Sequence, residues 1–171
     1  IMVNELSPMA GETYAYNFYN EDLSQPSFLE KQDPHTVWLS SKYSSDDMSL
    51  RLREDPREYP DLKSTSSFSD VSNLDSIRYK LIIGSIKELN QVLKSSPSML
   101  KSINDADVVS GGPPCQSFSM AGLRELSNDR NTLPWEFMQF VKLTHPKIAV
   151  LENVSGILRA FRSEGKPYYA W

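Results

Sequence analysis

Short apolar runs that alternate with amphipathic stretches are the feature that most limits how this chain of 171 residues can fold. The runs have the length of buried strands, and they lie at residues 1–5, 80–84, 107–109 and 148–151. Helical patterns follow Ser7, Ser85 and Thr132, each of which can cap a helix N-terminus. Because strands that alternate with helices build βαβ units, the sequence predicts an α/β fold with a mostly parallel sheet.

The helix after Ser85 carries the clearest local signal. Ser85 and Glu88 have the spacing of a capping box, in which each side chain satisfies a backbone N–H at the helix start. Ile86, Leu89 and Leu93 fall on one helical face, so we expect this face to pack against the sheet.

Residues from 41 to about 78 differ from the rest of the chain. Roughly a quarter of them are serine, acidic and basic side chains nearly cancel, and Pro56 and Pro60 interrupt any long helix. We expect an inserted surface excursion or a partly mobile loop, with a short helix near residues 48–53. An alternative is that the arginines of this stretch contact the phosphate backbone of a nucleic acid.

Composition excludes several classes of protein. One cysteine cannot form an internal disulfide framework or a cysteine-rich zinc site. No apolar run approaches the roughly 20 residues that cross a bilayer. The formal net charge of −4 argues against a broadly basic surface for nucleic acid. His35 and His145 have no recognisable partner in the sequence, so no metal site is indicated.

The ends of the predicted strands carry the residues best suited to chemistry, because open α/β sheets bind ligands beyond the carboxyl ends of their strands. In residues 111–115, two glycines allow close backbone approach and two prolines stiffen the chain before Cys115. A cysteine on such a rigid step is suited to act as a nucleophile once its thiol ionises. Taken alone, a free cysteine such as Cys115 is more often a small buried residue, and it is the surrounding residues that favour the nucleophile.

Three stretches extend this pattern: GGPPCQSFSMAG, NDRNTLPWEF and KIAVLENVSGIL. In type and order they resemble three motifs of the DNA cytosine-5 methyltransferase family. Two weaker matches lie upstream, NELSPMAGETYAYNFYN and LIIGSI. The resemblance covers most of the chain outside the serine-rich excursion.

The resemblance implies a Rossmann-like methyltransferase sheet and transfer of a methyl group from S-adenosyl-L-methionine to C5 of cytosine. Cytosine C5 is a weak nucleophile, so Cys115 would add to C6 and convert the ring into an enamine. Glu152 would supply or share the proton at N3, acid–base work worth typically 10²–10⁴-fold. The cytosine would first be flipped out of the duplex. The alternative for Glu152 is a carboxylate that caps the following turn.

The resemblance also implies roles for residues around this pair. Contacts with DNA from the loop that closes over the flipped base are expected from Gln116, Ser117, Ser119 and Arg124. Structural support for the site is expected from Pro114, Arg130 and Asn153. Ordinary loop residues are the alternative for the three polar side chains, and Arg124 could instead pin the loop.

The cofactor site implied by the resemblance has fewer contacts than is usual. Glu5 follows the first strand, where a carboxylate can accept both ribose hydroxyls. Leu6 stands where many members have an aromatic residue against the adenine, and Ser85 stands where the family usually has an acid facing the adenine amino group. Ile86 and Leu133 would supply apolar walls.

Several family motifs have no counterpart here, among them the opening glycine-rich turn, the Gln-x-Arg-x-Arg element and the target-recognition region. In the family's sheet, the strand before that turn lies between those at 1–5 and 107–109, and its loss exposes two strand edges. We therefore expect an incomplete sheet and a partial catalytic domain over residues 1–171. Its expected partners are double-stranded DNA and a complementary segment or subunit that supplies the missing motifs.

Three functions fit these residues. The leading expectation is a DNA (cytosine-5-)-methyltransferase of restriction–modification or phage type, and the Ser-Phe-Ser after Gln116 favours this branch. The alternatives are a tRNA cytosine-5 methyltransferase and a non-catalytic subunit or pseudo-enzyme of a split methyltransferase. A bacterial or phage protein of this kind would act in the cytoplasm, and a eukaryotic one in the nucleus.

Overall fold

The structure is a computed structural model that describes residues 1–114 and 132–155, and also the backbone of residues 161–163 and 166–168. The chain forms two compact units, Ile1–Asp105 and Ala106–Trp171. Each contains parallel strands, which confirms the predicted α/β class.

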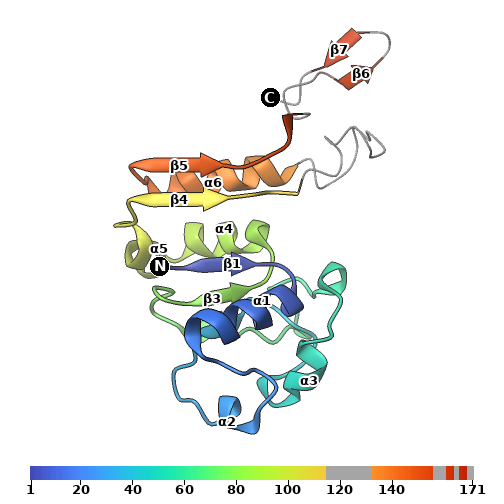
Figure 1. The fold of residues 1–171 in the computed structure, drawn as a ribbon, viewed down its shortest axis with the longest axis vertical. Helices are drawn as coiled ribbons and strands as arrows, with labels where there is room; N and C mark the ends of the chain where they lie inside the picture. Colours follow the sequence, from blue (N-terminus) through green and yellow to red (C-terminus); the bar gives the residue numbers. More distant parts are fainter. Residues whose placement is uncertain (115–131, 156–160, 164–165, 169–171) are drawn as a thin grey trace. The chain divides into compact units, whose positions relative to one another are not determined.

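The sheet of the first unit has three parallel strands in the order β1–β3–β2. They are β1 (Val3–Glu5), β2 (Thr36–Trp38) and β3 (Leu81–Ile83), and Figure 1 shows β1 beside β3. All three residues of β3 are fully buried, as expected for the central strand of a parallel sheet. The strands predicted at residues 1–5 and 80–84 are thus confirmed, whereas the sequence pattern gave no indication of β2.

Helix α1 (Pro8–Tyr14) packs on β1 and β3 and continues as a π-helical turn, Ala15–Tyr19. The approach is close at Gly11, where a Cβ atom would lie 2.7 Å from Cδ1 of Ile83. Ser7 occupies the N-cap position, but its side chain makes no capping hydrogen bond. The helix is therefore held by packing and by its Pro8 start rather than by a polar cap.

Helix α4 (Ile86–Ser95) follows β3, and its Leu89 and Leu93 side chains are buried as predicted. The Ser85 hydroxyl accepts the Lys87 N–H at 3.2 Å, so one half of the capping box is present. The other half is wrong, because the Glu88 carboxylate instead accepts hydrogen bonds from the Ser40 hydroxyl and the Leu62 N–H. Two further helices in this unit, α2 (Pro26–Leu29) and α5 (Pro97–Ile103), were not predicted.

The serine-rich excursion is folded onto the first unit. It contains α3 (Met48–Arg51), which lies where a short helix was predicted, and three 3₁₀ turns at Ser45–Asp47, Pro56–Glu58 and Val71–Asn73. Its first residue pairs with Phe68 in an antiparallel bridge, in which the Phe68 N–H donates to the Ser41 carbonyl at 2.9 Å.

Arg51 holds the excursion from inside. Its guanidinium is 1% exposed, makes two hydrogen bonds to the Asp70 carboxylate at 2.7 and 3.1 Å, and lies 5.3 Å from the ring centroid of Trp38. The Asp70 carboxylate also accepts the Trp38 N–H at 2.9 Å, so the excursion is bonded to β2. A phosphate-tracking role is therefore wrong for Arg51, whose charge is used inside the protein.

The second unit pairs β4 (Val108–Gly111) with β5 (Ile148–Leu151) in parallel, and α6 (Leu133–Thr144) connects them in the chain. Helix α6 packs tightly on β4, because a Cβ atom at Gly111 would lie 2.7 Å from the Phe137 ring. These elements confirm the strands predicted at residues 107–109 and 148–151. A short antiparallel pair, β6 (Phe161–Ser163) and β7 (Lys166–Tyr168), was not predicted.

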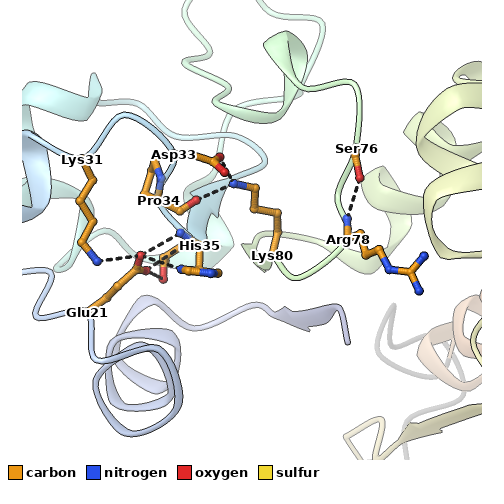
Figure 2. A network of polar contacts seen from close by, with 9 residues as sticks. Glu21, Lys31, Asp33, Pro34, His35, Ser76, Arg78 and Lys80 are labelled. Atoms are coloured by element: carbon orange, nitrogen blue, oxygen red, sulfur yellow. Dashed lines mark hydrogen bonds and ion pairs between the residues drawn. The ribbon is translucent and has the colours of Figure 1, made fainter.

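A buried carboxylate joins α1 to β2. The Glu21 side chain is fully buried, and Figure 2 shows Lys31 and His35 turned toward it. Glu21 accepts the backbone N–H groups of His35 and Thr36 at 2.8 and 3.0 Å and the Thr36 hydroxyl at 2.8 Å. Burial alone raises the pKa of Glu21, but these donors and the Lys31 ammonium group outweigh it and hold the pKa below its ordinary value.

We expect Glu21→Gln to lower the free energy of unfolding by about 2 kcal/mol at pH 7, because charged hydrogen bonds are lost and an amide N–H₂ faces N–H donors. The folded-state pKa of Glu21 is depressed, so its stabilisation is full above the unfolded pKa, near 4.5, and is lost as pH falls below it. Urea unfolding from pH 7 to pH 3 should show the difference between the two proteins shrinking. Glu30→Gln, at an exposed glutamate, is the matched control, and an equal effect there would contradict this explanation.

Among the helices of the described residues, none is long and apolar enough to cross a membrane. Within those same residues no three His, Cys, Asp or Glu side chains are grouped to hold a metal ion.

Candidate active site

The carboxyl ends of β1 and β3 bring together four of the residues expected at the cofactor site: Glu5, Leu6, Ser85 and Ile86. Glu5 pairs with Ile83 in the strand register, and the Gly84 N–H donates to the Glu5 carbonyl at 2.9 Å. The Asn4 side chain adds hydrogen bonds to the Ile82 and Gly84 carbonyls at 3.1 and 3.0 Å. The two chain turns that follow β1 and β3 are thereby locked side by side.

The Glu5 carboxylate is only partly committed within the protein. Its Oε1 atom accepts the Ser7 N–H at 2.9 Å, and this bond fixes the side chain at the end of β1. Oε2 has no hydrogen-bond partner within residues 1–114 and 132–155. A half-buried carboxylate with one oxygen anchored and the other open is suited to accept hydroxyl groups of a ribose.

Ser85 and Ile86 begin α4 beside this carboxylate. The Ser85 oxygen accepts one backbone N–H at the helix start, and a hydroxyl oxygen can accept a second hydrogen bond. Leu6 is 43% exposed, so its side chain presents an apolar surface next to Glu5. The described residues therefore fit the adenosine part of a nucleoside cofactor: a carboxylate, an apolar surface and a hydroxyl at one sheet edge.

The second unit brings the residues before Cys115 to the residues after β5. The Glu152 N–H donates to the Gly111 carbonyl at 3.0 Å and continues the β4–β5 ladder by one bond. Asn153 Nδ2 donates to the Pro113 carbonyl at 3.1 Å, and Asn153 Oδ1 accepts the Val154 N–H at 2.9 Å. Asn153 thus joins the Pro-Pro segment to the turn that carries Glu152, which is the kind of support expected from it.

Glu152 lies directly beside this segment. A Cβ atom at Gly112 would lie 3.3 Å from Glu152 Oε2, so the absence of a side chain there leaves room for the carboxylate. The Glu152 side chain is exposed. Pro114, two residues along the chain from Gly112, is also exposed and is followed by the candidate nucleophile.

The other expected site residues fall into two groups. Leu133 is the first residue of α6 in the second unit, while Glu5 and Ser85 belong to the first. Six residues lie outside the described part of the chain: Cys115, Gln116, Ser117, Ser119, Arg124 and Arg130. Their expected roles stay predictions.

Two residues at these edges have structural roles that the sequence does not predict. Asn4 stands with Glu5 at the end of the first predicted strand, but only the structure shows its amide tying together the turns after β1 and β3. Tyr59 comes from the excursion, and its hydroxyl donates to the Leu6 carbonyl at 3.3 Å. No sequence signal links residues 53 positions apart, so only the folded chain brings them together.

Comparison with known proteins gives the family. The family model described as C-5 cytosine-specific DNA methylase matches residues 73–165, which is more than half of the chain. No solved structure matches the chain.

Named relatives agree with this result. Type II methyltransferase M.DdeI of Desulfomicrobium norvegicum is 45% identical over 73 residues, which is 42% of this chain and 17% of that protein. Type II methyltransferase M1.HphI of Haemophilus parahaemolyticus is 53% identical over 66 residues, 36% of this chain and 18% of that protein. Orphan methyltransferase M.SPRI of Bacillus phage SPR is 32% identical over 99 residues, 57% of this chain and 20% of that protein. The chain therefore spans about a fifth of the length of these relatives, and it belongs to the C-5 cytosine-specific DNA methylase family.

Proposed function

We propose that this chain carries the catalytic residues of an S-adenosylmethionine-dependent DNA (cytosine-5-)-methyltransferase of restriction–modification type. The observation that carries the proposal is the juxtaposition at the ends of β4 and β5. There, the Asn153 side chain donates a hydrogen bond to the carbonyl of Pro113, which directly precedes Pro114-Cys115. This bond joins the Pro-Pro segment to the turn that bears Glu152. The family match and the Type II names of several relatives support the same reaction.

In this proposal the Cys115 thiolate forms a bond to C6 of a flipped cytosine. As that bond forms, the π electrons of the C5–C6 bond shift to a new C4–C5 double bond, and N3 takes a proton from Glu152. C5 of this enamine is nucleophilic enough to accept a methyl group, after which the C4–N3 double bond re-forms and the N3 proton returns to Glu152. Loss of the C5 proton to water then re-forms the C5–C6 double bond and expels the Cys115 thiolate.

The cofactor would be held at the ends of β1 and β3. Glu5 Oε2 would accept the ribose hydroxyls, Leu6 and Ile86 would contact the adenine, and the Ser85 oxygen would accept its amino group. Bound S-adenosylmethionine supplies an electrophilic methyl group on a sulfonium sulfur.

We also propose that catalysis uses a complementary segment or subunit. The relatives are about five times longer than the part this chain matches. On β4 and β5, Val108, Ile148 and Val150 are at least half exposed, which is unusual for apolar strand residues of a parallel sheet. Residues 1–171 expressed alone should therefore associate or fail to bind S-adenosylmethionine. A monodisperse protein of this length that binds it would overturn this part of the proposal.

Trapping on a modified base tests the reaction itself. DNA and tRNA duplexes that carry 5-fluorocytosine are incubated with the complete protein and S-adenosylmethionine, because fluorine at C5 blocks the last proton loss. A covalent complex with DNA that resists denaturation is the expected result. A complex on RNA alone would support the tRNA alternative, and none on either, with the protein folded, would support the non-catalytic alternative.

The named relatives come from bacteria and a bacteriophage. The proposal therefore places the protein with bacterial DNA in the cytoplasm, and a nuclear location has no support.

A further inference from the structure

The excursion crosses the same sheet edge at which Glu5 and Ser85 lie. At one end of residues 59–62, the Tyr59 hydroxyl donates to the carbonyl of Leu6, directly after β1. At the other end, the Leu62 N–H donates at 2.9 Å to the Glu88 carboxylate, in the first turn of α4 after β3. Residues 59–62, which we call the strap, therefore connect the two chain turns of the candidate cofactor site.

The strap is fixed from behind by buried bonds. Glu54 is 7% exposed and accepts the Ser41 hydroxyl at 2.6 Å and the Lys42 N–H at 2.8 Å. The Glu88 carboxylate accepts the Ser40 hydroxyl at 3.1 Å as well as the Leu62 N–H, so one side chain of α4 holds both the strap and the chain that follows β2. The Glu54 bonds and the buried Arg51–Asp70 pair hold the parts of the excursion before and after the strap.

Tyr59 is the residue of the strap that faces Leu6. It is half-buried and packs against the core cluster around Trp38, with its hydroxyl beside the Leu6 carbonyl. Burial, and then the nearby carboxylates of Glu54 and Glu5, raise the pKa of Tyr59 above its ordinary value. The hydroxyl therefore stays protonated and remains a donor to Leu6.

We propose that the strap forms a wall of the adenosine subsite and that Tyr59 supplies an aromatic contact to the bound nucleoside. The inference rests on the proposed cofactor site at Glu5. Leu6 offers only aliphatic surface there, and Tyr59 is tied to that same residue. A tyrosine ring held at such an edge can stack on a purine base, an interaction that is tolerant of the exact base because every base has a π-face.

Binding of S-adenosylhomocysteine to the complete protein measures this contact without requiring turnover. In calorimetric titrations, Tyr59→Leu should raise the Kd about tenfold, as expected for the loss of one base–aromatic contact. Tyr59→Phe keeps the ring and should change the Kd about twofold at most. The matched control is Tyr16→Leu, at a tyrosine that is 62% exposed on another part of the unit, and it should bind as wild type does.

Hydrogen exchange in the same proteins separates the strap from a general loss of stability. S-adenosylhomocysteine should slow exchange of amides in residues 59–64 as well as those near Glu5 and Ser85. Suppose that the ligand slows amide exchange near Glu5 and Ser85 but not in the strap, and that Tyr59→Leu binds it as tightly as wild type does. The inference is then wrong, and the proposed cofactor site stands. If wild type does not bind the ligand at all, the proposed cofactor site fails, and the inference fails with it.

Discussion

Replacing Cys115 with serine should lower the rate of methyl transfer to DNA by about 10⁴-fold or more. A serine hydroxyl is almost never ionised near neutral pH, whereas a thiol with a moderately lowered pKa supplies a strong nucleophile. Loss of a covalent nucleophile removes a whole reaction path, so the effect is far larger than that of a lost contact. Single-turnover transfer of a labelled methyl group to a DNA duplex measures it.

The chain offers favourable conditions for this experiment, because Cys115 is its only cysteine. No other thiol within residues 1–171 can replace it, and thiol labelling of these residues reports on Cys115 alone. Cys115→Ala, which removes the nucleophile and keeps a small side chain, should bind DNA as wild type does. Methyl transfer by Cys115→Ser within tenfold of wild type would show that this thiol is not the nucleophile.

Replacing Glu152 with glutamine should lower the rate of the chemical step by about 10²–10⁴-fold, the usual contribution of a positioned acid or base. Glutamine keeps the size of the side chain and its place beside Gly112, but it cannot pass a proton to N3. Glu152→Asp retains the carboxyl group on a shorter side chain, so we expect an intermediate rate. Affinity for DNA and for S-adenosylhomocysteine should be little changed in both variants.

Single-turnover rates and the trapping reaction test this assignment together. Glu152→Gln should form the covalent complex on 5-fluorocytosine DNA more slowly, because proton transfer accompanies the attack at C6. Glu30→Gln, at an exposed glutamate of the first unit, serves as the control for amide substitution. A wild-type rate of trapping with Glu152→Gln would leave this carboxylate with only a role in capping the turn.

The strands were the most predictable part of the fold. Runs such as Leu81–Ile83 are apolar throughout because both faces of a central parallel strand are buried, and that pattern is visible in the sequence. β2 was missed since Thr36 and Trp38 are buried by partners far along the chain, among them Glu21 and Arg51. The three residues of β2 are too few, and too mixed in polarity, to show a strand-like pattern in the sequence.

The polar network of the excursion could not be predicted, for a related reason. Its composition indicates a solvated loop, yet Arg51 and Glu54 are buried because Asp70 and Ser41 neutralise or bond them. Burial of a charge depends on its partner, and no local pattern reveals a partner that lies 19 residues away. Motif order identified Glu5, Glu152 and Asn153 as candidate site residues, whereas the contact of Tyr59 with Leu6 is visible only in the folded chain.

The bridge between Ser41 and Phe68 closes most of the excursion into a loop whose two ends lie side by side. Because the chain leaves and returns at one hydrogen-bonded pair, the exposed residues between 42 and 67 can change in number or kind without altering the path of β2 or β3, provided that the buried Met48, Arg51 and Glu54 are kept. Under the roles proposed above, such changes would bring new side chains to the sheet edge at Glu5 and Ser85. They would alter affinity for the cofactor and leave the residues at the strand ends as they are.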